Sequence, residues 1–178
     1  MRYKAIELLN KYLLTEKMKK HSLVVEAMMI AFAKFFNPDQ LEIWSVAGIL
    51  HDLDYDITSY KICPQLHGLK TIEILKDENF GNEEIYSIIA AHNEKTGIKA
   101  ESIGQKIIIS SNITANIIYE KLYSNSKKNY IKFDYDTILK DNNIYDRQTI
   151  NLIESTGIKI NHFIDISLKV TKNIIDNN

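Results

Sequence analysis

The sequence has few of the residues that cross-link or interrupt a chain. It contains one cysteine, Cys63, together with two prolines and six glycines among 178 residues. A single cysteine cannot form an internal disulfide, which excludes a disulfide-stapled fold and is typical of a reducing compartment. The shortage of glycine and proline favours helices over a β-sandwich, because a sandwich needs many tight turns.

Long apolar runs and arginine are also scarce. No stretch approaches the roughly 18 apolar residues of a membrane-spanning helix, and the N-terminal segment lacks the apolar run of a signal peptide. Of the 22 basic residues all but Arg2 and Arg147 are lysine, and the net charge is −1. Arginine does much of the reading of phosphate and guanine in nucleic-acid interfaces. The composition therefore predicts a cytoplasmic protein with no membrane partner and no dedicated nucleic-acid surface.

The glycine- and cysteine-based motifs of several large protein classes are missing too. The chain has no GxGxxG, no GxxxxGK[ST], no GxSxG and no Cys-x-x-Cys. Dinucleotide-binding folds, P-loops, serine hydrolases with a nucleophile elbow and zinc ribbons therefore have no support from the sequence.

What the sequence does contain is apolar residues at helical spacing. Ile85, Ile88, Ile89 and His92 recur at i, i+3, i+4 and i+7, and Asn82 is a suitable N-cap for that helix. The same periodicity and its breaks predict helices over 3–15, 19–36, 39–51, 65–78, 82–93, 101–123, 134–140, 146–154 and 160–175.

These helices predict an all-α fold in two parts. We expect a helical core over residues 1–123 and a smaller C-terminal helical part over 124–178 that packs on this core. The polar segment 124–129 is the best candidate for a linker between them.

Four histidines lie where predicted helices begin or end. His21 and His67 lie near helix starts, and His51-Asp52 and His92 lie near helix ends. Helix ends can converge inside a bundle, and imidazole and carboxylate groups are ligands for first-row metals. Any one of these histidines could instead be a hydrogen-bonded core residue. The whole set, in this order, makes a metal site the stronger hypothesis.

These residues occur in segments that resemble the HD-domain superfamily of metal-dependent phosphohydrolases. The segments are KKHSLVVEAM around His21, AGILHDLDYD at 47–56, QLHGLKTIEIL around His67 and IIAAHNEKTG around His92. The resemblance covers about residues 20–123. Within the superfamily, the chain looks most like the small bacterial HD-domain proteins. It implies an all-helical HD-domain bundle and a ligand order of His, His-Asp, His, His and a distant Asp.

The resemblance also implies a cofactor and a reaction. His21, His51, Asp52, His67 and His92 would hold one or two divalent ions of Mn, Fe, Zn, Co or Mg, and Asp52 would bridge two ions. The substrate would be a small phosphorylated molecule, with a nucleotide as the expected class.

One position departs from the pattern of this superfamily. Its last ligand is an Asp in a segment like AADALTGLI, and the matching stretch here is ISSNITANII. Aligning Thr114 with the Thr of that segment places Ser111 at the Asp position. Ile103, Ile107 and Ser111 share one helical face, so we expect Ser111 to point into the site. Loss of the carboxylate would weaken metal binding, which leaves a second hypothesis open: a degenerate HD-fold module that binds a nucleotide or partner without hydrolysis.

Residues close to the ligands in sequence are candidates for proton transfer and substrate binding. Asp52 would position the metal, while Asp54 and Glu94 could orient the attacking water or take its proton. Three lysines could neutralise a substrate phosphate: Lys61, Lys70 and Lys95. The alternative is that these acidic and basic residues only form a solvated surface.

Overall fold

The computed structural model describes residues 1–58, 62–124 and 145–176, and all regular structure in this part of the chain is helical. The α-helices are α1 (Arg2–Tyr12), α2 (Glu16–Phe36), α3 (Leu41–Leu50), α4 (Leu69–Asp77), α5 (Glu83–Ala91), α6 (Ile103–Ser124), α8 (Arg147–Glu154) and α9 (Ile160–Asp176). Short 3₁₀ helices precede α3, α4 and the loop to α6: η1 (Pro38–Gln40), η2 (Pro64–Leu66) and η3 (Glu94–Thr96). The predicted all-α fold is confirmed. None of the described helices is long and apolar enough to cross a membrane.

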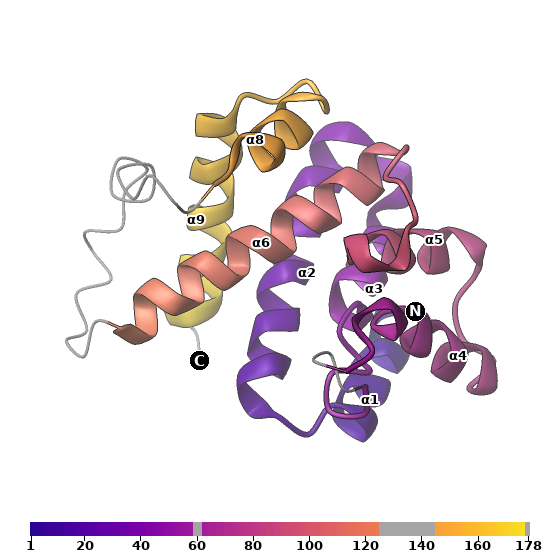
Figure 1. The fold of residues 1–178 in the computed structure, drawn as a ribbon. Helices are drawn as coiled ribbons and strands as arrows, with labels where there is room; N and C mark the ends of the chain where they lie inside the picture. Colours follow the sequence, from indigo (N-terminus) through magenta and orange to yellow (C-terminus); the bar gives the residue numbers. More distant parts are fainter. Residues whose placement is uncertain (59–61, 125–144, 177–178) are drawn as a thin grey trace.

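Helix α2 lies at the centre of the bundle and contacts α3, α6 and α9 (Figure 1). Helices α1, α3, α4 and α5 lie on one side of it, and α8 and α9 lie on the other. The stacked rings of Phe32 on α2 and Phe163 on α9 are 4.5 Å apart. One hydrophobic core runs from Leu8 on α1 through α2 to Ile164 on α9. The C-terminal helices therefore share the core of the N-terminal ones.

Helices α2 and α3 approach each other closely at Gly48. A Cβ atom at this position would lie 2.8 Å from the Cα atom of Glu26. The buried Glu26 carboxylate accepts hydrogen bonds from the guanidinium of Arg2 and, at 2.7 Å, from Ser45 Oγ. This close approach brings His51 at the end of α3 near His21, which lies in the second turn of α2.

The fourth helix begins later than its periodicity predicts. The prediction was 65–78, but α4 begins at Leu69, so His67 lies in the turn between η2 and α4. Gly68 interrupts the helix because its φ is +85°, a backbone conformation that glycine adopts without strain. A Cβ atom here would also meet His92 Cε1 at 2.8 Å. The predicted helix 134–140 and most of the predicted linker 124–129 lie outside the described residues.

We predict that Gly48→Ala destabilises the protein, although alanine is the better helix former by about 1 kcal/mol. The added methyl must push against the α2 backbone, and overpacking of this kind costs about 1–3 kcal/mol. For a chain of this size, each kcal/mol lowers the melting temperature by about 2–4 °C in a thermal melt. Ser87→Ala, on the exposed face of α5, is the control and should leave the melting temperature nearly unchanged. A higher melting temperature for Gly48→Ala would contradict the close α2–α3 contact.

Candidate metal centre

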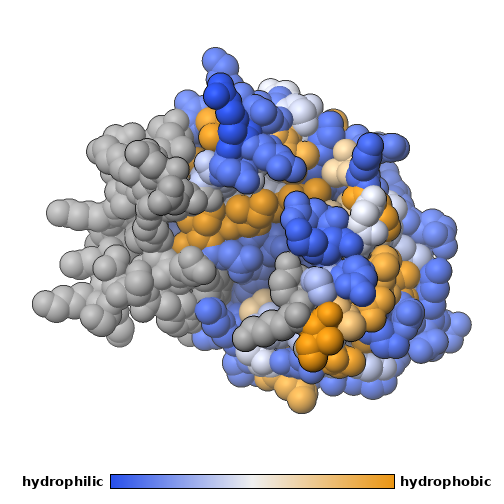
Figure 2. All heavy atoms as spheres, in the orientation of Figure 1, coloured by the Kyte–Doolittle hydropathy of each residue, from blue (hydrophilic) through white to orange (hydrophobic). Residues whose placement is uncertain are grey.

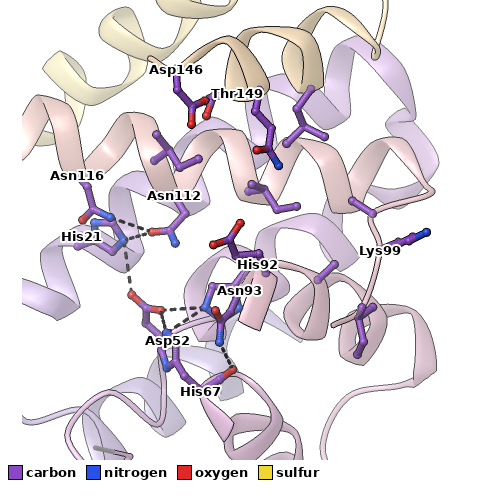
Figure 3. Close-up of a pocket in the computed structure, with 18 of the residues that line it drawn as sticks. His21, Asp52, His67, His92, Asn93, Lys99, Asn112, Asn116, Asp146 and Thr149 are labelled. Atoms are coloured by element: carbon purple, nitrogen blue, oxygen red, sulfur yellow. Dashed lines mark hydrogen bonds and ion pairs between the residues drawn. The ribbon is translucent and has the colours of Figure 1, made fainter. Parts of the chain in front are cut away.

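Four imidazoles converge on the carboxylate of Asp52, and Figure 3 shows three of them, His21, His67 and His92. The Nε2 atoms of His67 and His92 lie 3.0 and 3.3 Å from Oδ1 of Asp52, and those of His51 and His21 lie 3.3 and 3.6 Å from Oδ2. All five residues are buried. They come from α2, the end of α3, the turn before α4 and the end of α5. The structure thus brings together all five residues that the sequence proposed as ligands.

The cluster divides into two groups that share Asp52. His21, His51 and Asp52 form one group, and Asp52, His67 and His92 form the other, with the potential ligand atoms of each group within 4.8 Å of one another. Each oxygen of Asp52 faces one group. Two imidazoles and one carboxylate are a donor set suited to first-row transition metals more than to Mg²⁺.

Hydrogen bonds on the far side of two rings prepare their Nε2 atoms to bind a cation. Nδ1 of His51 lies 2.9 Å from the carbonyl of Gly48, and Nδ1 of His92 lies 2.6 Å from that of Ile89. Because a carbonyl only accepts, Nδ1 carries the proton and Nε2 of a neutral ring keeps its lone pair. The lone pair of His51 Nε2 then faces one oxygen of Asp52 at 3.3 Å, and that of His92 Nε2 faces the other oxygen at the same distance. Acceptor atoms that face one another in the interior fit a bound metal ion.

Asp54 lies behind His67 and fixes the orientation of its ring. Asp54 Oδ1 lies 2.9 Å from Nδ1 of His67. The carboxylate also accepts hydrogen bonds from Thr71 Oγ1, Thr58 Oγ1 and the amide of Gly68. Asp54 is fully buried and does not line the pocket over the cluster. The expectation that Asp54 orients the attacking water or takes its proton is therefore corrected: it is a positioning residue for a candidate ligand.

The cluster favours positive charge at its centre. Burial favours the neutral form of His67, but hydrogen bonds and charge from Asp52 and Asp54 raise its pKa to about 10. Burial alone would raise the pKa of Asp52, but the surrounding imidazoles hold it well below its usual value. Burial lowers the pKa of His21 to about 4, against the attraction of Asp52. The negative charge of Asp52 thus opposes the effect of burial on both imidazoles.

The structure corrects the expectation for Ser111 on α6. Asn112 Oδ1 lies 2.9 Å from Nε2 of His21, and Asn112 lines the pocket (Figure 3). Ser111 is fully buried, does not line the pocket, and its hydroxyl has no hydrogen-bond partner among the described residues. One residue along a helix is a rotation of about 100°, so the alignment through Thr114 chose the wrong face. The sequence did contain a signal for Asn112. Asparagine has the shape of aspartate, and the small residues Ser110 and Ser111 match the two alanines that precede the Asp in the AADALTGLI segment.

A pocket of about 1150 Å³ opens above the cluster, between the ligand-bearing turns and helices α6 and α8. Figure 2 shows a hydrophilic hollow on this face beside an apolar band that follows α6. Glu94 on η3 lines the pocket, as its suggested role requires. Two lysines that the sequence did not single out, Lys17 and Lys99, line it as well. With 20 lysines in the chain, sequence position alone gave no signal for these two.

Two of the three predicted phosphate-binding lysines, Lys70 and Lys95, do not line the pocket. Lys70 pairs with Glu73 on the exposed face of α4. Lys95 pairs with Glu94 at 2.7 Å and does not line the pocket. Lys61 lies outside the described residues. The roles proposed for Lys70 and Lys95 are corrected accordingly, because neither residue lines the space above Asp52.

Asn93 is a second residue that the sequence analysis did not single out. Its side-chain amide donates to the carbonyl of Pro64 at 2.7 Å and to that of His67 at 3.0 Å. These bonds tie the turn that carries His67 to the end of α5 that carries His92. The available signal was its place in the IIAAHNEKTG segment, directly after His92.

We predict that Asp52→Ala lowers metal content more than any of the four single His→Ala changes. Asp52 belongs to both groups, whereas each histidine belongs to one, so a histidine variant leaves the other group complete. Elemental analysis of the purified variants after loading with Mn²⁺ or Zn²⁺ measures this. His162→Ala is the control, because His162 is exposed on α9 and far from the cluster in sequence. Equal residual metal in Asp52→Ala and His67→Ala would reject the shared role, and thermal melts would identify unfolded variants.

Adjacent substitutions on α6 test the corrected register. Asn112→Asp adds a carboxylate beside His21, so the affinity for Mn²⁺ in titration calorimetry should rise by about tenfold or more, a scale that single changes at metal sites reach. Ser111→Asp instead places a charge at a fully buried position that does not line the pocket, and should lower the melting temperature without a gain in affinity. The opposite pattern, with tighter metal binding only in Ser111→Asp, would restore the alignment through Thr114.

Comparison with known families agrees with this geometry. A family model, described as HD domain, matches residues 18–130, which is more than half of the chain. No match was found among curated proteins or among solved structures. The matched range contains all five candidate ligands and Asn112. The chain belongs to the HD domain family.

Proposed function

We propose that this protein is a metal-dependent phosphohydrolase that acts on a small phosphorylated molecule, and that this molecule is a nucleotide. The observation that carries the proposal is the shared Asp52, which lies between two histidine groups at the base of a large pocket. A divalent cation held there would supply hydroxide at neutral pH and polarise a phosphoryl oxygen.

The surrounding residues supply the remaining functions. Lys17 lines the pocket and can offset the charge of a phosphate group that lies over Asp52, whereas the side chain of Lys99 points away from Asp52 (Figure 3). Glu94 is exposed at the pocket wall, so its carboxylate can accept a proton from water or a leaving group. Asp54 holds the ring of His67, and Asn93 holds its backbone carbonyl. A volume of about 1150 Å³ is at the upper end for small-molecule pockets, which fits a nucleotide.

A second candidate function is binding without hydrolysis. Asn112 favours it, because a neutral carboxamide lies beside His21 where the family has a carboxylate. Asp52 is then the one carboxylate that directly faces both histidine groups within the described residues. Less negative charge makes a second divalent ion harder to hold.

Phosphate release distinguishes the two functions. We expect purified protein with added Mn²⁺, Fe²⁺, Zn²⁺ or Co²⁺ to release phosphate from at least one of p-nitrophenyl phosphate, nucleoside monophosphates and nucleoside triphosphates. Asp52→Ala should lose at least about a hundredfold in rate, since both ion positions depend on it. His162→Ala should behave like wild type. Nucleotide binding without release would support the second candidate, and neither binding nor release would contradict both.

A further inference from the structure

The pocket has two chemically different sides. The side around the metal centre presents charged groups, including Lys17, Asp52 and Glu94. The side formed by α6 and α8 presents carboxamides and aliphatic groups, and none of its described lining residues is a cation. The residues on which the argument depends are Asn116, Gln148 and Asn151, together with the aliphatic Ile113 and Leu152.

The amide side begins at the metal centre. Asn112 and Asn116 are one helical turn apart on α6, and Asn116 Nδ2 lies 3.5 Å from Asn112 Oδ1. Asn112 Oδ1 in turn lies 2.9 Å from His21 Nε2. Figure 3 shows this row of polar side chains between the cluster below and α8 above. One small molecule can therefore reach from Asp52 to the amide side.

Helix α8 is held over the pocket by buried contacts. Tyr145, directly before α8, shares a hydrogen bond of 2.6 Å with Thr114 on α6, and both residues are buried. Asp146 caps α8, and its Oδ1 accepts a hydrogen bond from the amide of Thr149 at 2.7 Å. Asp146 lines this end of the pocket, and none of the described α6 and α8 residues that line it is a cation, which disfavours a phosphate group there.

We propose that the amide side of the pocket binds the nucleobase of a nucleotide whose phosphate lies over Asp52. This proposal rests on the proposed function, because it uses the same site. A nucleobase presents donors and acceptors along its edge and two apolar faces. The carboxamides of Gln148 and Asn151 supply both donors and acceptors, and amide side chains can pair with a base edge through two hydrogen bonds. Ile113 and Leu152 supply apolar surface for the faces.

The direct test compares ligands with and without a base. Affinities of full-length protein with Mn²⁺ would be measured for AMP, GMP, CMP, UMP and ribose 5-phosphate. We expect at least one nucleotide to bind tenfold or more tighter than ribose 5-phosphate. In the double variant Gln148→Ala/Asn151→Ala this nucleotide should lose at least tenfold in affinity, about the loss expected for one hydrogen bond of about 1.4 kcal/mol. Ribose 5-phosphate should bind as before.

Matched variants separate recognition from folding. Gln148 and Asn151 are exposed, so their truncation leaves the core untouched. The isosteric pair Gln148→Glu/Asn151→Asp keeps their shape, removes their donors and should also weaken nucleotide binding. Glu154→Ala, an exposed change on α8 that does not line the pocket, is the control and should bind like wild type.

Two results would overturn the base site. One is ribose 5-phosphate binding as tightly as every nucleotide, and the other is a double variant that keeps the wild-type preference. Phosphate release measured on the same samples keeps the two proposals distinguishable. Nucleotide binding that depends on Gln148 and Asn151 without release would support the base site and contradict hydrolysis. Release with equal KM for nucleotides and ribose 5-phosphate would support hydrolysis and contradict the base site.

Discussion

The fold depends on a buried carboxylate that needs positive charge around it. Asp52 lies in the interior, and an isolated carboxylate there would cost several kcal/mol. Four imidazoles from separate helices and turns surround it, and the negative charge of Asp52 attracts positive charge to this place. A metal ion bound here would couple binding to folding, because the same contacts that hold the helix ends together also form the candidate ligand set.

Small residues and polar contacts outside the cluster make this convergence possible. Gly48 lets α3 approach α2, and Gly68 leaves room for the ring of His92. Asp54 holds the ring of His67, and Asn93 ties the turn of His67 to the end of α5. Each of these residues contacts a segment that carries a candidate ligand. Asp54 is only two residues from Asp52 in sequence, but its carboxylate is held behind the ring of His67 and does not reach the pocket.

The C-terminal helices give the site its size. Without α8, the pocket would lose the wall that faces the metal centre. This wall is anchored on α6 by the buried pair Thr114 and Tyr145, while α9 packs on α2 through Phe163. The candidate metal centre is rich in charged groups, whereas this wall is mostly amide and aliphatic. The reacting phosphate can therefore be assigned to the N-terminal helices, and recognition of the rest of the substrate to α6 and α8.

The sequence by itself predicted the all-α fold, most helices in the described part of the chain, the five residues that meet at Asp52 and the resemblance to the family, because helical periodicity and short motifs are local properties. It could not determine which side chain of α6 reaches His21, since a shift of one residue turns the helix by about 100° and Ser111 and Asn112 are both small and polar. It also could not separate Lys17 and Lys99 from the other lysines, or place α8 opposite Asp52. Those outcomes depend on how distant helices pack, which only the tertiary structure decided.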